Sequence, residues 1–275
     1  MDIGRIRTFL FVPANRPDRF DKALHSGADA IIVDLEDAVA PCEKEAARHD
    51  LERWLKTAPC QVFVRVNAAE SEWHVGDLAA CHSPAVCGIL LPKAESVSIL
   101  ETAHFLSKKP VLPIIESAKG LDQLKAIAGA EGCARLVFGK LDLAVDLGLE
   151  QDERDKEEIV FHPYRAQLVL ASRLARLPPP VEGVFTALAA DDELLAYSRR
   201  ARRDGFSAVL VIHPRQIGPV TTALTPSGDE VTWARRVLVA ATEAGGNAAV
   251  VDGRMIDAPV IARANRILAA ANQCQ

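Results

Sequence analysis

Eight short apolar segments recur along the chain, and this repetition restricts the fold more than any other feature. They cover residues 8–13, 28–34, 61–67, 87–93, 110–117, 134–140, 181–187 and 207–214. Apolar runs of this length, bounded by turn residues, are typical of strands buried on both faces of a parallel sheet. Amphipathic stretches of helical period separate them, so strands and helices alternate. The pattern predicts a TIM-type (β/α)8 barrel of the α/β class.

Length and the first turn favour the barrel over a doubly wound open sheet. The chain has 275 residues, which is close to the roughly 250 of a typical TIM barrel. An open sheet would usually carry a glycine-rich phosphate turn after its first strand. The sequence VPANRPDR at that place contains no glycine.

The pattern changes after the eighth segment, which predicts two domains. Residues 1–225 are predicted to form the catalytic barrel and residues 226–275 a C-terminal helical extension. The extension reads as two helices, TPSGDEVTWARRVLVAATEAG and APVIARANRILAAANQ, joined by the strand-like or loop segment NAAVVDGRMID. Between the sixth and seventh strands, the acidic stretch GLEQDERDKEEI predicts a solvated surface loop.

Charge and hydropathy exclude several classes of partner. The net charge is -5 and the arginines are scattered, so no nucleic-acid partner is expected. The apolar run near the N-terminus ends at Pro13, too early for a signal-peptide core or a membrane span. We therefore predict a cytoplasmic protein without a membrane partner.

Polar side chains gather at the ends of the predicted strands. In a TIM barrel, the active site is built from the C-terminal ends of the strands and the loops after them. The residues at these positions are Asn15, Arg16, Asp34, Glu36, Asp37, Arg65, Asn67, Lys93, Glu116, Asp142 and His213. So many charged groups at one rim indicate a site rather than packing.

Glu116 and Asp142 follow neighbouring strands and are candidate ligands of a metal ion. A hard cation such as Mg²⁺ commonly uses one or two protein carboxylates and completes its shell with water and substrate oxygens. Each residue also has a structural interpretation, because Glu116 could favour a helix start through the dipole and Asp142 could be a cap.

Arg65 ends a strand that is otherwise apolar. A guanidinium there can bind a carboxylate through two parallel hydrogen bonds, or it can form a buried ion pair with Asp34 or Glu36. Lys93 is interpreted as a cation that balances the acidic rim. A Schiff-base role would require a depressed pKa, and we do not favour it.

Taken together, these segments resemble one known family. The motifs are RTFLFVPANRPDRFDKAL, VDLEDAVAP, VRVN, LPKAES, PIIES, FGKLDLAVDLG, VIHPRQ and DGRMIDAP. In order and spacing they are similar to the citrate lyase β-subunit-like family of the HpcH/HpaI aldolase superfamily. The resemblance covers nearly the whole chain, and one departure is Ala14, where relatives often have Gly.

The resemblance implies an enzyme that cleaves a carbon–carbon bond. The expected substrate is a 3-hydroxyacyl-coenzyme A thioester of the citramalyl-CoA, malyl-CoA or citryl-CoA type, and the products are acetyl-CoA and a 2-oxo acid. The expected cofactor is Mg²⁺, with Mn²⁺ as an alternative, and coenzyme A enters as part of the substrate. The family also implies a homotrimer.

Site residues follow from the resemblance position by position. Glu116 and Asp142 match the metal ligands, and Arg65 matches the arginine that binds the substrate carboxylate. Asp257 matches a catalytic aspartate that a neighbouring subunit can supply. Arg65 is expected to act in catalysis as well as in binding. The expected substrate contacts are Arg65, Glu116, Arg16 and Lys93, with Arg16 and Lys22 at the CoA phosphates. Asp34, Glu36 and Asp37 are expected to support Arg65.

Several alternatives stay open at this point. A malate or citramalate synthase or a thioesterase would use the same thioesters, and a class II aldolase would act on free hydroxy-oxo acids. A non-catalytic subunit with this fold is a further alternative. Citrate lyase α and acyl-carrier subunits are conceivable partners, but a stand-alone lyase is favoured.

Overall fold

The computed structural model describes residues 2–150, 158–244 and 249–272. It divides into two compact units, Met1–Thr221 and Thr222–Gln275. The division falls inside helix α10 (Ile217–Leu224). Most of the predicted acidic loop, residues 151–157, lies outside the described residues.

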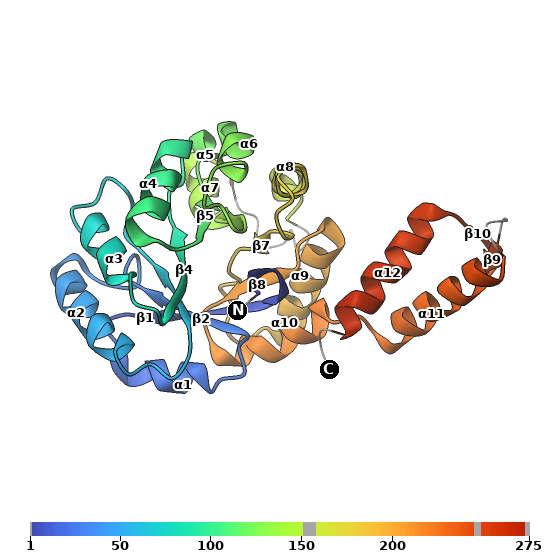
Figure 1. Cartoon of the computed structure of the whole chain (residues 1–275), viewed down its shortest axis with the longest axis horizontal. Coiled ribbons are helices and arrows are strands. Elements are labelled where there is room, and N and C mark those ends of the chain that lie inside the picture. The colour runs from blue at the N-terminus through green and yellow to red at the C-terminus, as the bar shows by residue number, and fades with distance from the viewer. Residues whose placement is uncertain (1, 151–157, 245–248, 273–275) are drawn as a thin grey trace. The chain divides into compact units, whose positions relative to one another are not determined.

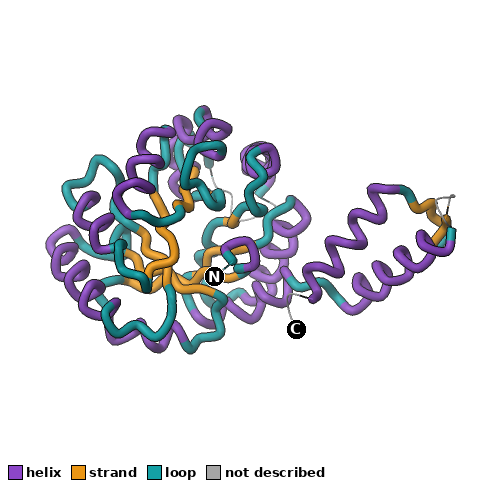
Figure 2. Tube along the Cα trace, in the orientation of Figure 1, coloured by secondary structure: helices purple, strands orange, loops and turns teal. Residues whose placement is uncertain are grey.

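The first unit is a closed barrel of eight parallel strands in sequence order, which confirms the predicted TIM-type fold. Figures 1 and 2 show the strands inside a layer of helices. The strands are β1 (Thr8–Pro13), β2 (Ala30–Asp34), β3 (Val62–Arg65), β4 (Val86–Leu91), β5 (Val111–Ile115), β6 (Val137–Phe138), β7 (Val181–Glu182) and β8 (Ala208–Val211). Each coincides with one predicted segment, although β6 and β7 are much shorter than predicted.

Helices follow the strands in the alternating order expected of the barrel. They are α1 (Phe20–Leu24), α2 (Lys44–Leu55), α3 (His74–Ala80), α4 (Val97–Ser107), α5 (Ala118–Asp122), α6 (Leu124–Ala128), α7 (Lys140–Asp146), α8 (His162–Leu174), α9 (Asp191–Asp204) and α10. Short 3-10 helices are η1 (Ile3–Arg5), η2 (Pro17–Arg19), η3 (Pro41–Glu43), η4 (Ile159–Phe161) and η5 (Pro214–Gln216). Caps define several ends: Ser96 accepts a hydrogen bond from the N–H of Ile99, and α9 ends at left-handed Gly205.

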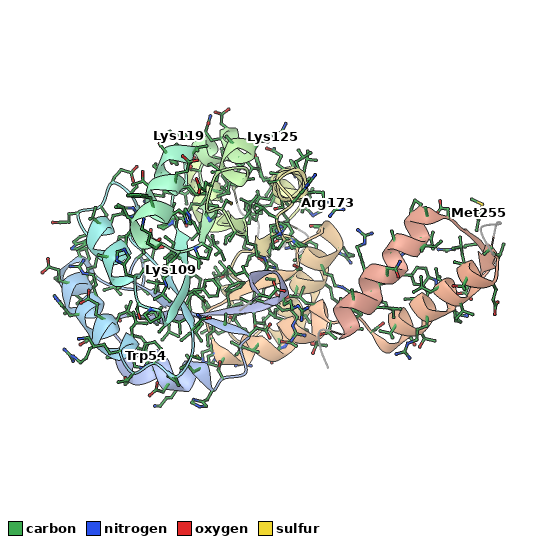
Figure 3. The ribbon with its side chains drawn as sticks, viewed as in Figure 1. Trp54, Lys109, Lys119, Lys125, Arg173 and Met255 are labelled. Atoms are coloured by element: carbon green, nitrogen blue, oxygen red, sulfur yellow. The ribbon has the colours of Figure 1, made fainter. Side chains whose placement is uncertain are left out.

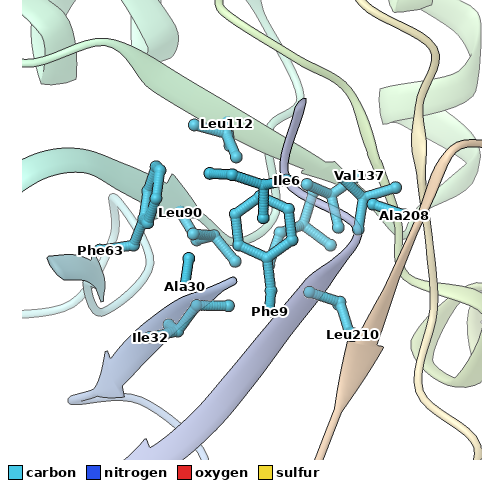
Figure 4. Close-up of a cluster of buried hydrophobic side chains, with 12 residues drawn as sticks. Ile6, Phe9, Ala30, Ile32, Phe63, Leu90, Leu112, Val137, Ala208 and Leu210 are labelled. Carbon is cyan, nitrogen blue, oxygen red and sulfur yellow. The ribbon is translucent and has the colours of Figure 1, made fainter. Parts of the chain in front are cut away.

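Apolar side chains from most of the strands fill the interior of the barrel (Figure 4). Phe9 and Phe63 meet edge to face with ring centroids 5.3 Å apart, a favourable arrangement of aromatic rings. Gly88 is required beside them, because a Cβ there would lie 2.8 Å from the Phe63 ring. The packed interior leaves the C-terminal rim as the place for a site.

The second unit is a helical hairpin with a small β-hairpin between its helices. Helix α11 (Gly228–Glu243) begins with a capping box between Ser227 and Glu230. Strands β9 (Ala249–Val251) and β10 (Arg254–Ile256) pair antiparallel, and helix α12 (Ala258–Asn272) follows. Asp252 and Gly253 both have positive φ, as a two-residue hairpin turn requires. Over residues 249–256, the segment predicted as strand-like or loop is thus a hairpin.

Within the described ranges, none of the helices combines the length and the apolar composition needed to cross a lipid bilayer.

Candidate active site

Asp34 and Arg65 form the centre of the rim at β2 and β3. Each is the last residue of its strand, and the sheet register places them directly opposite one another. Arg65 Nε donates to Asp34 Oδ1 at 2.7 Å, and Nη2 donates to Oδ2 at 2.6 Å. Two parallel charge-assisted bonds fix the plane of the guanidinium. One face of the guanidinium lies over the Phe11 ring, with Cζ 4.8 Å from the ring centroid.

Two further carboxylates lie against the remaining side of Arg65. Its Nη1 is 3.2 Å from Asp37 Oδ2 and 3.0 Å from Glu36 Oε2. The Asp37 side chain is 70% exposed, whereas Glu36 Oε2 is buried and accepts no hydrogen bond from the described part of the chain. Three carboxylates therefore surround one arginine, and the buried oxygen of Glu36 has an ion pair but no hydrogen bond.

The excess of carboxylates around Arg65 affects the pKa values of Glu36 and Arg65. Burial raises the pKa of Glu36 to about 8, and the charges of Asp37, Glu116 and Asp34 add to it while Arg65 opposes it. Burial works against the charged form of Arg65, but its hydrogen bonds and ion pairs with Asp34 outweigh that and raise its pKa. The ion pairs thus favour the charged form of Arg65, whereas burial disfavours the charged form of Glu36.

Glu116 comes directly after β5 and is buried. Its Oε1 accepts a hydrogen bond of 2.7 Å from the backbone N–H of Lys93, which adopts the left-handed conformation with a φ of 47°. Gly139 makes room for it, because a Cβ at that position would lie 2.7 Å from Glu116 Oε2. The backbone at two other strand ends is shaped to hold this one carboxylate.

Asp142 lies in the first turn of α7 and is exposed. Burial raises the pKa of Glu116 to about 7, the Lys93 N–H opposes this, and the charge of Asp142 raises it further. The two carboxylates therefore lie close enough to repel each other. Asp146, one turn later, accepts a hydrogen bond from the N–H of Ala118 and supports the start of α5.

Lys140 begins α7 but does not compensate this pair. Its ammonium lies 2.6 Å from Glu158, whose other oxygen is 2.5 Å from Arg165 and 2.7 Å from Arg200. Arg165 also pairs with the buried Glu182 at 2.7 Å. This charge cluster was not predicted from the sequence, because its members are separated by up to 60 residues and none forms a recognisable motif.

The carboxylates at β5 and β6 can hold a divalent cation. Within the described residues, neither Glu116 nor Asp142 forms an ion pair with a cationic side chain. Over the same ranges, no group of three His, Cys, Asp or Glu side chains is placed to hold a metal. A pair of carboxylates with room for water and substrate oxygens suits Mg²⁺, which is seldom bound by an all-protein cage.

The other predicted site residues, Arg16, Lys93 and Asp257, make different interactions. Arg16 is exposed and pairs with Asp18 at 2.9 Å. The side chain of Lys93 is also exposed, so the contribution of this residue to the rim is its backbone N–H. Asp257 precedes α12, where its Oδ1 accepts a hydrogen bond of 3.1 Å from the N–H of Val260 as an N-cap.

Behind Arg65 lies a polar cage that the sequence did not reveal. Lys44 and Asp77 are buried, and both hydrogen-bond to Asn67, the second residue after β3. Sequence reasoning noted Asn67 only as a strand-end residue. Lys44 and Asp77 lie on amphipathic helices, where a charged residue is normally solvated, so no local signal marked them.

A (β/α)8 barrel with carboxylates and a fixed arginine at the C-terminal rim has its polar groups where barrel enzymes have their active sites. The family model of HpcH/HpaI aldolase/citrate lyase matches residues 7–214. The chain belongs to this family of lyases, and within it to the citrate lyase β-subunit-like proteins.

Relatives of known name agree with this assignment. A citrate lyase subunit beta-like protein of Mycobacterium tuberculosis is 35% identical over 96% of this chain and 95% of its own length. A (3S)-malyl-CoA thioesterase of Cereibacter sphaeroides is 33% identical over 96% of this chain and 94% of its own length. The crystal structure of CitE from M. tuberculosis with magnesium, acetoacetate and coenzyme A is 32% identical, with a TM-score of 0.87 and coverage of 98% of this chain and 100% of that one.

Proposed function

We propose that this protein is a Mg²⁺-dependent lyase that cleaves a 3-hydroxyacyl-CoA thioester of the citramalyl-CoA, malyl-CoA or citryl-CoA type into acetyl-CoA and a 2-oxo acid. The observation that carries the proposal is the Glu116 carboxylate. It is buried, it faces the space left by Gly139, and it has no cationic partner in the described part of a chain that belongs to a lyase family.

Glu116 and Asp142 would hold Mg²⁺, with Mn²⁺ as the alternative ion. When bound, the cation supplies Lewis-acid stabilisation of the negative charge that develops on substrate oxygens. The relatives support this choice, because CitE structures contain magnesium together with acetoacetate or oxaloacetate. In its ionised form, Glu36 would add negative potential at the same rim.

Arg65 would bind the carboxylate of the substrate acid through Nη1. Asp34 accepts hydrogen bonds from Nε and Nη2 of Arg65 and so holds the guanidinium in place. The exposed Asp37 can move aside for the substrate. The bidentate pair makes Arg65 a rigid donor and not a mobile one, which lowers the entropic cost of orienting the substrate.

Asp257, supplied by a neighbouring subunit of the proposed homotrimer, would protonate the acetyl carbon. Cleavage breaks the bond between C2 and C3, the electron pair moves to the thioester as an enolate, and C3 becomes the carbonyl carbon of the oxo acid. The proton that leaves the hydroxyl group is balanced by the proton that Asp257 delivers to C2. The N-cap hydrogen bond occupies Oδ1 and orients the carboxyl group.

A thioesterase is the second candidate, and the observation that favours it is the relative named (3S)-malyl-CoA thioesterase. A synthase would first condense acetyl-CoA with an oxo acid and then hydrolyse the thioester, so it would also release a free hydroxy acid and CoA. Both differ from a lyase in one bond, because hydrolysis releases free CoA thiol while carbon–carbon cleavage keeps the thioester as acetyl-CoA.

A substrate panel separates these readings. Citryl-, malyl- and citramalyl-CoA, and a free 4-hydroxy-2-oxo acid, are incubated with Mg²⁺ and with EDTA. We expect an oxo acid and acetyl-CoA in equal amounts from one thioester, no free thiol, and loss of activity with EDTA. Release of thiol without oxo acid would identify a thioesterase, and turnover of the free acid alone would identify an aldolase.

The Asp257→Asn variant tests proton transfer separately from folding. Asparagine remains a good N-cap, so α12 should be retained. Loss of a positioned acid is expected to lower kcat by about 10²–10⁴-fold with unchanged Mg²⁺ binding. Full turnover by this variant would remove Asp257 from the mechanism.

The quaternary state and cellular place complete the proposal. We propose a cytoplasmic homotrimer that works without citrate lyase α or acyl-carrier subunits, with Arg16 and Lys22 at the CoA phosphates. Light scattering on the purified chain tests the trimer. Turnover of a CoA thioester by that chain alone tests its independence.

A further inference from the structure

We infer that Lys44 is a positioning residue for the acidic segment after β2, and that it acts on the site through the backbone of Glu36. This inference rests on the proposed function, because it assigns Lys44 a role in cation binding at the same rim. Lys44 begins α2 and is only 7% exposed, an unusual position for an ammonium group.

All three hydrogen-bond donors of the Lys44 ammonium have partners. Nζ donates to the carbonyl oxygens of Leu35 and Glu36, both at 2.9 Å, and to Asn67 Oδ1 at 2.6 Å. The Trp73 ring covers it, with the centroid 5.3 Å away. One side chain thus ties the segment after β2 to the segment after β3.

The acceptor on β3 is itself fixed, so the bridge has a rigid end. Asn67 donates from its backbone N–H and from Nδ2 to Asp77 Oδ2, at 3.0 and 2.6 Å. Its carbonyl lies 2.7 Å from His74 Nδ1. Arg48 reaches the other oxygen of Asp77 at 3.3 Å. Lys44 therefore links the backbone of Glu36 to this fixed cage.

The consequence for the site concerns the Glu36 side chain. Its carboxylate lies against Arg65, where Oε2 is ion-paired with Nη1 at 3.0 Å but accepts no hydrogen bond from the described residues, and the negative charge of Glu116 acts on it. A cation held by Glu116 would feel the same charge, because Coulomb interactions are strong in a half-buried site. Release of the Glu36 carbonyl by loss of Lys44 would let the loop turn and the carboxylate move toward solvent.

The presence of a buried lysine at this place needs an explanation beyond packing. Burial lowers the pKa of Lys44, and the charges of Glu36 and Asp34 oppose that shift. An apolar residue would avoid the desolvation cost of the ammonium, but it could not hydrogen-bond two carbonyl groups and an amide at once. The geometry favours a role in holding the loop.

Arg48 provides a matched control on the same helix. It is a half-buried cation that belongs to the same cage, but its side chain donates to Asp77 and not to the segment after β2. We propose to compare Lys44→Met, Lys44→Gln, Arg48→Met and Glu116→Gln. The probe is Mn²⁺ without substrate, followed by the electron paramagnetic resonance signal of the free ion, together with the midpoint of thermal unfolding.

Lys44→Met is expected to raise the Mn²⁺ dissociation constant about 10-fold or more, as for other residues that support metal ligands. Lys44→Gln keeps two amide donors and should show a smaller increase. Arg48→Met should lower the unfolding midpoint and leave Mn²⁺ binding unchanged. If Lys44→Met does not fold, Lys44→Gln carries the comparison.

Unchanged Mn²⁺ affinity in the folded Lys44 variants would overturn the inference, as would an equal loss in Arg48→Met. Failure of the proposed function looks different, because Glu116→Gln would then bind Mn²⁺ as well as the unchanged protein does.

Discussion

The rim at β2 and β3 and the rim at β5 and β6 are built in opposite ways. At the first, the Arg65 guanidinium is surrounded by Asp34, Glu36 and Asp37. At the second, Glu116 and Asp142 repel each other, and no cationic side chain of the described residues pairs with them. The first rim is built from the protein's own opposite charges, whereas the second has carboxylates without cationic partners, and there we propose that a metal ion binds.

The difference arises because the lysines near the two rims are bound to other groups. Lys140 is two residues from Asp142 but is bound by Glu158, and Lys44 supports the backbone of Glu36. Buried carboxylates without partners cost stability unless they take up a proton or a metal. The contrast therefore predicts that breaking the Arg65–Asp34 pair mainly affects folding, and that mutations of Glu116 or Asp142 mainly affect metal binding.

Arg65→Met should have the largest effect, on the free energy of unfolding. The change keeps an apolar stem over Phe11 but leaves the buried Asp34 without its partner. Breaking one side of a buried ion pair costs about 3–5 kcal/mol, measured by denaturant unfolding. Arg16→Met, at an exposed pair with Asp18, is the control and should unfold as the unchanged protein does. Equal stability of both variants would contradict a prebuilt first rim.

Glu116→Gln should come next, with the opposite signature. Loss of metal stabilisation is expected to lower kcat/KM by about 100-fold or more, which corresponds to about 2.7 kcal/mol. Unfolding without metal should be no easier, because a repulsive charge is removed. The control is Glu95→Gln, whose carboxylate is already paired with Ser117 and with Lys119, labelled in Figure 3. A comparable activity loss in the control would show that the effect is not specific to Glu116.

The pH dependence should be smaller. The pKa of Glu116 is raised to about 7 from an ordinary value of 4.5, so between these values the folded chain keeps a proton that the unfolded chain has lost. Stability without metal should therefore fall as pH rises from 4.5 to 7, and on to about 8 because of Glu36. Saturating Mg²⁺ should flatten the fall, and its affinity should rise up to about tenfold per pH unit below 7. Stability curves with and without Mg²⁺ that run parallel would count against a metal at Glu116.

Asp37→Asn should have the smallest effect. The side chain is largely exposed, and exposed ion pairs are worth at most about 1 kcal/mol. A slightly lower KM for the acid part of the substrate is expected, because a competing anion beside Arg65 is neutralised. A loss of stability as large as that of Arg65→Met would mean that Asp37 is part of the rigid support.

Much of this architecture could be predicted from residues close together in the chain. Each apolar run contains its own signal of burial, so the eight strands and their order followed from the sequence. The polar residues directly after the strands, including Arg65 and Glu116, followed from the same reading because a barrel brings all these ends to one rim. The ion pair of Arg65 with Asp34, kept open as an alternative, is present in the structure.

Only the tertiary structure decided how the charges are distributed among partners. Register places Asp34 opposite Arg65, the left-handed Lys93 turns a backbone N–H toward Glu116, and Lys44 reaches across to Asn67. These contacts join residues 23 to 31 positions apart in the chain. The direction of a side chain and the identity of its partner are fixed only when the strands pair and the barrel closes, so local sequence contains no signal for them.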